Sequence, residues 1–158
     1  MSNICKIVTL FSVLAITACS STGDTEESLT PEVVSESTQI EAQVTNVERE
    51  ALATTVFYFD FNSDNISAED RATLVYHAIK LKGSTDLSIR LEGHASEEGT
   101  REYKLALGER RADAVAMFLM ANGVALSQIE VVSYGEEQPA VVGSTQDALS
   151  KNRRVEIK

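Results

Sequence analysis

Cysteine is scarce in this sequence, because its 158 residues contain only Cys5 and Cys19. The stretch beyond Cys19 has no thiol, which excludes a disulfide framework and any cysteine-based metal site there. Basic residues are also few, with 14 Lys and Arg against 24 Asp and Glu and a formal net charge of −10. Phosphate contacts need clustered Lys and Arg, so a nucleic acid is not an expected partner.

The sequence also lacks an apolar run long enough to cross a bilayer, which takes about 20 residues. Its most apolar stretch, residues 7–16, follows the single charge of Lys6 and leads through small residues to Cys19. A charged start, a short apolar core and a small-residue end predict a secretory signal over residues 1–18. Ile16-Thr17-Ala18-Cys19 also resembles a lipobox, which implies lipidation of Cys19. An ordinary signal cut somewhere nearby is the alternative.

Residues 19–53 are predicted to be the lipidated N-terminus and an acidic, flexible tether. From Ser20 to Thr38 the sequence is rich in Ser, Thr and Glu, and it cannot bury enough apolar surface to offset the cost of ordering. Two or more acyl chains on Cys19 would give a lasting membrane anchor. Four apolar residues then fall at the spacing of a short amphipathic helix: Ile40, Val44, Val47 and Ala51.

Residues 54–158 have the length of one domain and alternate between strand and helix patterns. Apolar runs and period-two alternation predict strands at 56–59, 87–91, 129–134 and 154–157. One helix is predicted from Ser67 to just before Gly83, and a longer one closes at Asn122-Gly123. The last two strands are joined by a predicted loop. This alternation predicts an α/β fold, a mixed sheet with helices packed on one face.

Five short motifs follow one another along this domain: Phe59-Asp60-Phe61, Glu92-Gly93-His94-Ala95, Leu107-Gly108-Glu109-Arg110-Arg111-Ala112, Val132-Ser133-Tyr134-Gly135 and Ser150-Lys151-Asn152-Arg153-Arg154-Val155. Together they resemble the signatures of the OmpA-like domain, in particular that of the peptidoglycan-associated lipoproteins. The resemblance covers roughly residues 55 to 158 and implies a βαβαβ-type two-layer sandwich. It also implies non-covalent binding of the peptide stem of peptidoglycan through the ammonium and carboxylate of its diaminopimelate residue.

The resemblance implies that Arg111 takes the carboxylate of this ligand. A guanidinium offers a planar fork to a carboxylate, and that charge-assisted pairing is stronger than a neutral hydrogen bond. Arg111 belongs to the stripe of the long helix that faces the sheet, where a desolvated cation needs a partner. The alternative is an ion pair with Glu92 or Glu109 that only fixes the helix.

Several positions depart from the family pattern. Ser96 stands where the family has the aspartate that takes the ammonium group, and a hydroxyl cannot neutralise that charge. Asn62 replaces a common aspartate, Glu98 an arginine and Lys104 an asparagine. Either Glu97 or Glu98 supplies the missing negative charge, or the pocket serves another ligand or binds no cell-wall peptide. The predicted pocket consists of six residues: Arg111, Ser96, Phe61, Asn62, Glu97 and Glu98.

Other chemistries fit the sequence poorly. The segment from Asp60 opens like a calcium loop, but Asn65 and Arg71 stand where such a loop needs Gly and Glu. His94 has no second histidine at ligand spacing, and no nucleophile–base pair is recognisable. We therefore expect no metal site, no cofactor and no catalysis.

These patterns predict a non-enzymatic lipoprotein of the outer membrane that faces the periplasm of a Gram-negative bacterium. Lipid on Cys19 would hold the membrane while residues 54–158 bind the peptidoglycan stem peptide, with other envelope proteins as further candidate partners. The alternative is an envelope interaction protein of the same fold, which has lost or altered the diaminopimelate pocket and docks another protein.

Overall fold

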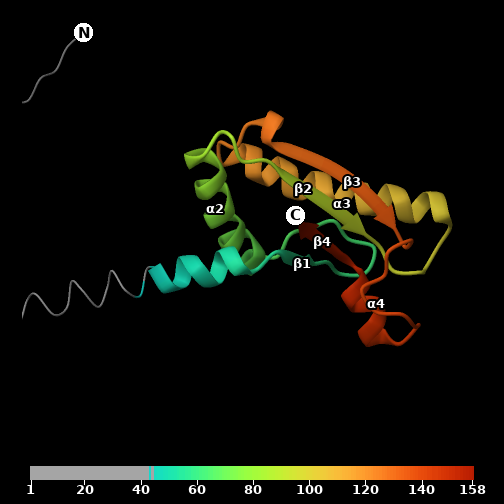
Figure 1. Cartoon of the computed structure of the whole chain (residues 1–158). Helices are drawn as coiled ribbons and strands as arrows, with labels where there is room; N and C mark the ends of the chain where they lie inside the picture. Colours follow the sequence, from blue (N-terminus) through green and yellow to red (C-terminus); the bar gives the residue numbers. More distant parts are fainter. Residues whose placement is uncertain (1–42, 44) are drawn as a thin grey trace, which may run out of the picture. The chain divides into compact units, whose positions relative to one another are not determined.

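The computed structural model describes residue 43 and residues 45–158. After a helix over residues 45–53, the chain forms β1 (Val56–Tyr58), α2 (Ala68–Gly83), β2 (Ile89–His94), α3 (Arg101–Ala121), a 3-10 turn (Leu126–Gln128), β3 (Ile129–Gly135), α4 (Gln146–Asn152) and β4 (Arg154–Ile157) (Figure 1). The predicted signal, the lipidation site Cys19 and most of the predicted tether lie outside the described residues. None of the described helices is long and apolar enough to cross a membrane.

The four strands form one mixed sheet in the order β1-β4-β2-β3. β4 runs antiparallel to both of its neighbours, whereas β2 and β3 are parallel. A parallel pair needs a crossover connection, and α3 provides it between β2 and β3. The predicted mixed α/β sheet is confirmed.

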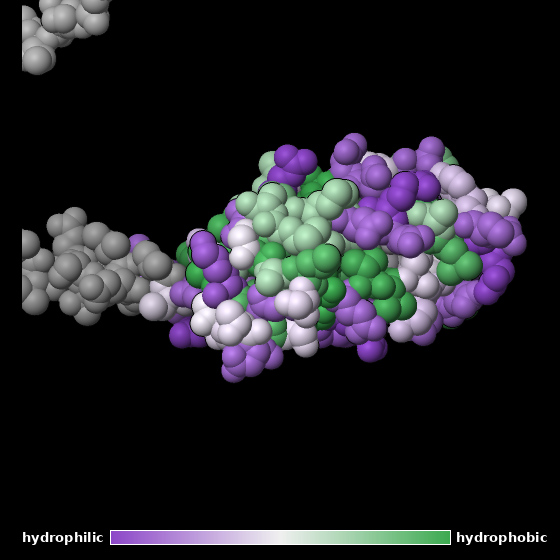
Figure 2. Space-filling view, turned by 90° about the horizontal axis from the view of Figure 1, so that it is seen from above, coloured by the Kyte–Doolittle hydropathy of each residue, from purple (hydrophilic) through white to green (hydrophobic). Residues whose placement is uncertain are grey.

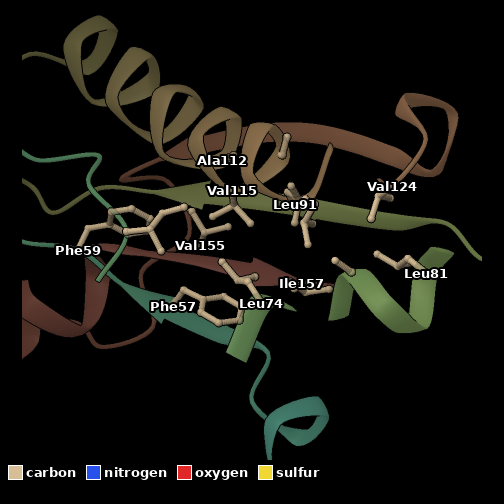
Figure 3. Close-up of a cluster of buried hydrophobic side chains, with 14 residues drawn as sticks. Phe57, Phe59, Leu74, Leu81, Leu91, Ala112, Val115, Val124, Val155 and Ile157 are labelled. Atoms are coloured by element: carbon tan, nitrogen blue, oxygen red, sulfur yellow. The ribbon is translucent and has the colours of Figure 1, made fainter. Parts of the chain in front are cut away.

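The helices α2 and α3 pack against one face of this sheet (Figure 3). Phe57, Gly93 and Val155 lie side by side on three adjacent strands and therefore share that face. The core consists of these strands' apolar side chains and those of the two helices: Phe57, Leu91, Val155, Ile157, Leu74, Ala78, Leu81, Ala112, Val115 and Leu119, all buried. Truncating one of the large side chains to Ala would cost about 2–5 kcal/mol of stability, because the cavity fills only partly.

The predicted helix ends are close to those observed. The Ser67 side chain accepts a hydrogen bond from the Asp70 amide at 3.0 Å and caps α2, which ends at Gly83, one residue later than expected. Asn122 caps the end of α3, and Gly123 follows with a positive φ of 94°, the left-handed conformation that glycine tolerates. The helix over residues 45–53 occurs where the apolar spacing predicted one, but Val47 remains 51% exposed.

The second strand differs from its prediction. The strand begins at Ile89 rather than at Leu87, and it continues to His94. Leu87 is 42% exposed because the chain there turns, with its amide bonded to the Ser84 carbonyl. The Leu87 carbonyl accepts a hydrogen bond from the Gln128 side chain at 2.8 Å instead of from a neighbouring strand.

The connection between β3 and β4 contains a helix, α4, where the sequence predicted only loop. Thr145 caps this helix by accepting a hydrogen bond from the Ala148 amide at 3.2 Å. Two turns give too little apolar periodicity for a pattern to be recognised. α4 carries the chain back to the sheet, and it ends immediately before Arg153 and β4.

Two glycines bring α3 unusually close to the sheet. A Cβ atom on Gly93 would lie 2.0 Å from the Gly108 carbonyl oxygen, and one on Gly108 would lie 2.4 Å from the Ser133 hydroxyl. Only glycine at both positions permits this approach. Arg111, one turn beyond Gly108, is thereby brought to the end of β2, where the loop of residues 95–100 begins.

Candidate functional site

Arg111 is the centre of the candidate site, and its side chain is completely buried. Its guanidinium donates to three backbone carbonyls: Nε to Ser63 at 2.8 Å, Nη1 to His94 at 2.9 Å and Nη2 to Asp60 at 3.1 Å. The ring of Phe59 lies beneath it, 5.4 Å from centroid to Cζ. These contacts fix the plane of the guanidinium and account for three of its five N–H groups.

The charge of Arg111 is not neutralised by any ion pair within the described part of the chain. The structural alternative, pairing with Glu92 or Glu109, is therefore not observed. Burial, and to a lesser extent the neighbouring Arg153, lowers the pKa of Arg111 to about 10. The side chain is still a cation at neutral pH, and an unpaired buried cation is costly unless an anion joins it.

A cavity of about 190 Å³ opens beside this guanidinium. It is lined by Phe61, Asn62, Ser96, Glu98, Gly99, Tyr103, Leu107, Arg111 and Arg153. Five of the six predicted pocket residues therefore meet here, although they come from three separate segments of the chain. Glu97 is the exception, since it lines another hollow with Glu136, Pro139 and Val142.

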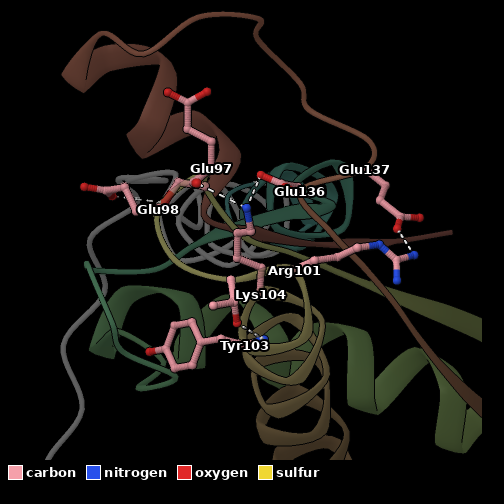
Figure 4. Close-up of polar contacts among 9 residues, drawn as sticks. Glu97, Glu98, Arg101, Tyr103, Lys104, Glu136 and Glu137 are labelled. Atoms are coloured by element: carbon pink, nitrogen blue, oxygen red, sulfur yellow. Dashed lines mark hydrogen bonds and ion pairs between the residues drawn. The ribbon is translucent and has the colours of Figure 1, made fainter.

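The negative charge of the cavity belongs to Glu98. Ser96 is buried, and its hydroxyl donates to the Glu98 carboxylate at 3.2 Å. Figure 4 shows Glu97 and Glu98 pointing in different directions from adjacent positions. Of the two glutamates considered from the sequence, Glu98 is thus the one placed in the cavity with Arg111.

The loop that presents Glu98 is held by Lys104, a buried lysine of α3. Its ammonium group donates to the Glu97 carbonyl at 3.2 Å and forms an ion pair with Glu136, just after β3 (Figure 4). An exposed ion pair between Arg101 and Glu137 lies beside it. Lys104 therefore fixes the peptide next to Glu98 while its own charge is turned away from the cavity and neutralised.

The opposite wall of the cavity is formed by the turn after β1. Asn62 adopts a positive φ of 51°, a left-handed conformation that asparagine tolerates better than most residues. Its side-chain oxygen accepts a hydrogen bond from the hydroxyl of Tyr103. Figure 2 shows mostly hydrophilic residues at the end of the folded domain where α3 begins.

Sequence reasoning missed Tyr103 and Arg153 as lining residues. Tyr103 lies in the first turn of α3, directly after the loop of residues 95–100, so its closeness in sequence to Ser96 and Glu98 was a usable signal. Arg153 lies 42 positions after Arg111 and reaches the cavity only because β4 occupies the middle of the sheet beside β1. No group of three or more metal-binding side chains occurs among the described residues.

Comparison with known proteins yields a family match over most of the folded domain. The model of the OmpA family matches residues 58–153. The peptidoglycan-associated lipoprotein of Pseudomonas aeruginosa is 48% identical over 106 residues, which cover 67% of this chain and 62% of that protein. That of Pasteurella multocida is 48% identical over 97 residues, covering 61% and 65% respectively. The chain thus spans less than two thirds of the length of these curated relatives.

Solved structures agree with this match. The crystal structure of the peptidoglycan-associated lipoprotein from Burkholderia pseudomallei superposes with a TM-score of 0.67 at 39% identity, covering 68% of this chain and 91% of that one. The C-terminal domain of Helicobacter pylori MotB superposes with a TM-score of 0.61 at 24% identity, covering 66% and 83%. The second likeness extends to the fold alone.

Proposed function

Since this chain belongs to the OmpA family, we propose that its domain binds the peptide stem of peptidoglycan non-covalently and thereby tethers an outer membrane to the cell wall. The protein acts by binding and not by catalysis. Residues 1–18 are the signal, residues 19–53 the lipidated tether and residues 54–158 the binding domain. The names of its relatives, peptidoglycan-associated lipoproteins, support this assignment.

One observation supports the proposal most directly: Arg111 is a buried, oriented cation that faces a cavity and has no acidic partner among the described residues. Three carbonyls hold its plane, and the two remaining N–H groups belong one to each Nη atom. A carboxylate entering the cavity supplies the missing anion and is met by a guanidinium that loses no further side-chain freedom. Diaminopimelate offers such a carboxylate at the end of a slender side chain.

The ammonium group of the same ligand is bound by Glu98, with Ser96 as a supporting hydrogen-bond donor. The cavity thus contains one cation and one anion, which suits an amino acid end that bears both charges. This arrangement keeps the charge complementarity of the family although Ser96 is not an aspartate. Phe61 and Asn62 line the cavity beside these two charges.

Co-sedimentation with purified peptidoglycan tests the proposal. The wild-type full chain is expected to pellet with the sacculus, while Arg111→Ala remains in the supernatant. Arg111→Lys keeps the charge but loses the planar fork, so we expect it to bind at least tenfold more weakly than the wild type. Circular dichroism of each variant separates loss of binding from loss of fold. Undiminished pelleting of a folded Arg111→Ala protein would remove this residue from the mechanism.

A wild-type chain that fails to pellet would instead favour the protein-docking alternative. Calorimetry with free meso-diaminopimelate complements this assay, because it measures binding to the cavity without the rest of the peptidoglycan polymer.

A further inference from the structure

A second hollow adjoins the Arg111 cavity and is not explained by the binding of diaminopimelate alone. Its volume is about 400 Å³. It is lined by Tyr58, Phe59, Asp60, Ser150, Lys151 and Arg153. Arg153 also lines the first cavity, so the two spaces share this residue.

Arg153 has the properties of an anion-binding group. Its Nε donates to the Phe59 carbonyl at 3.1 Å, and no ion pair with an acidic side chain occurs in the described residues. The same two residues also bond through their backbones, since the Phe59 amide donates to the Arg153 carbonyl at 2.8 Å. The side chain is therefore fixed at its Nε atom, while the four N–H groups of its two Nη atoms have no acceptor among residues 43 and 45–158.

The two arginines act on adjacent carbonyls of the same turn. Arg153 binds that of Phe59, and Arg111 binds that of Asp60. Phe59 and Asp60 also line the second hollow, so a ligand held by Arg111 lies close to that hollow. A peptide spans at most about 3.6 Å per residue, and the next residue of a bound peptide needs only to reach the shared guanidinium.

The other residues that line the second hollow favour a peptide segment that is acidic and partly apolar. Lys151 adds a second cation and is 50% exposed, with one weak surface ion pair to Asp147 at 2.8 Å. The Tyr58 ring is 53% exposed and offers an apolar flank. Asp60 lines the hollow as well, but its carbonyl is already engaged by Arg111, and its carboxylate is outnumbered by the two cations.

We propose that this hollow is a second subsite, which binds a further carboxylate of the same peptide stem through Arg153 and Lys151 while Tyr58 covers the adjoining aliphatic part. This inference rests on the proposed function and extends it. The preferred ligand is then a peptide in which an acidic residue with a free carboxylate neighbours the diamino acid. The domain would then recognise two neighbouring residues of the peptide stem and not diaminopimelate alone.

Calorimetry of the full chain in detergent, with three ligands, tests the subsite. The ligands are free meso-diaminopimelate, a stem peptide with a free carboxylate on the neighbouring residue, and the same peptide with that carboxylate amidated. We expect the free-carboxylate peptide to bind the wild type about tenfold more tightly than the amidated one, the factor that corresponds to one favourable charge-assisted contact.

Substitutions at the hollow should remove that preference. Arg153→Gln is expected to bring the ratio of the two peptide affinities close to one, and Lys151→Gln to lower it about threefold. Arg153→Lys should restore part of the ratio, and Lys82→Gln, an exposed lysine of α2 with the same charge change, should leave it unchanged. Lys151→Gln should also leave the affinity for free diaminopimelate unchanged, since Lys151 does not line the first cavity.

Equal affinities of the wild type for the two peptides would overturn the subsite, as would an unchanged preference in Arg153→Gln. Failure of the proposed function looks different, because free diaminopimelate would then not bind the wild type at all. If Arg153→Gln proved unfolded by circular dichroism, the Lys151 variant and the amidated ligand would still decide the question.

Discussion

At the scale of single residues, the site keeps apart two opposite charges that line one cavity, those of Arg111 and Glu98. Arg111 is held by backbone carbonyls and therefore needs no carboxylate of its own chain for orientation. Glu98 is oriented by the Ser96 hydroxyl, a neutral donor that leaves its charge available. A direct Arg111–Glu98 ion pair would satisfy both groups and close the cavity. No such ion pair occurs among the described residues, so both charges remain available to a ligand.

The first prediction concerns which acid binds the ammonium group. Glu98→Gln should weaken binding of diaminopimelate about tenfold or more, because an ammonium loses its counter-charge in a partly desolvated cavity. Adding Ser96→Asp to that variant should restore most of the affinity, since the new carboxylate lies within the same cavity. Glu97→Gln is the matched control and should bind like the wild type. Equal losses in the Glu97 and Glu98 variants by calorimetry would contradict the assignment.

The second prediction concerns pH and His94. This ring is 1% exposed and stacks on Tyr134 at 5.6 Å, and burial, with a further contribution from Arg154, lowers its pKa to about 4. Protonation is thus easier in the unfolded chain, whose histidine has a pKa near 6.5. Stability should be fully present above pH 6.5 and should fall as the pH decreases toward 4, by about 2 kcal/mol between pH 7 and 5.

Urea unfolding at pH 7 and pH 5 measures this loss. His94→Phe keeps a ring against Tyr134 but cannot take a proton, so its loss over the same interval should be clearly smaller. Burial also lowers the pKa of His77, so some slope of the same sign should remain in that variant. An identical pH dependence in wild type and His94→Phe would contradict the prediction.

At the scale of elements, the closeness of α3 to β2 determines where the site forms. The contact of Gly93 with Gly108 places the buried stripe of α3 against the sheet and brings Arg111 to the end of the strand. A longer separation would carry the guanidinium away from the His94 carbonyl, which it reaches at 2.9 Å. The packing of one glycine pair thus controls the geometry of a binding group three residues away.

Gly93→Ala tests this packing. The added Cβ would meet backbone at 2.0 Å, so α3 must shift and the free energy of unfolding should fall by about 3 kcal/mol or more. Gly83→Ala is the control, because nothing lies within 4 Å of its added Cβ at the end of α2. That change should be neutral or slightly stabilising. Similar unfolding midpoints for the two variants would show that stability does not depend on the close approach of α3 to β2.

Lys104 connects three segments of the chain. It belongs to α3, donates a hydrogen bond to the loop of residues 95–100 and forms an ion pair with Glu136, the residue after β3. Lys104→Met keeps the apolar stem but frees the Glu97 carbonyl and leaves Glu136 unpaired. We expect faster amide exchange over residues 96–100 and several-fold weaker ligand binding in a folded protein. Arg101→Gln breaks the neighbouring exposed pair with Glu137 and should change little. Unaltered loop exchange in Lys104→Met would show that this lysine does not hold the loop.

Some of these elements could be read from the sequence, and others could not. The apolar run of β1 and the alternation of β4 are visible in the sequence, and Ser67 and Asn122-Gly123 mark helix ends by their capping chemistry. Leu87 follows the alternation of a strand, yet its amide donates to the Ser84 carbonyl in a turn and its carbonyl accepts from the Gln128 side chain, so it pairs with no strand. α4 is too short for a period to emerge. The side chain of Glu98 could not be distinguished from that of Glu97, because a loop does not impose a regular direction on consecutive residues.

At the scale of the whole molecule, two separate attachments are proposed, one at each end of the chain. The binding domain occupies the described residues, while the lipid is assigned to Cys19 by the sequence alone. Residues 20–42, which precede the helix over residues 45–53, would span about 80 Å if fully extended. Each attachment should therefore be removable without loss of the other, which distinguishes a bridge from a protein held by one contact only.

Cys19→Ser provides the last test. Without lipid, the protein should be lost from the outer-membrane fraction, because the acyl chains on Cys19 are its proposed anchor. Its co-sedimentation with purified peptidoglycan should be unchanged, whereas Arg111→Ala should show the opposite pattern, membrane-bound but free of the sacculus. Cys5→Ser is the matched control, since the predicted signal carries that residue away. Fractionation of cells expressing each variant, with radiolabelled palmitate to follow the lipid, compares the four proteins directly. If Cys19→Ser stayed with the membrane in a strain whose peptidoglycan had been digested, the anchor would have to lie elsewhere in the chain.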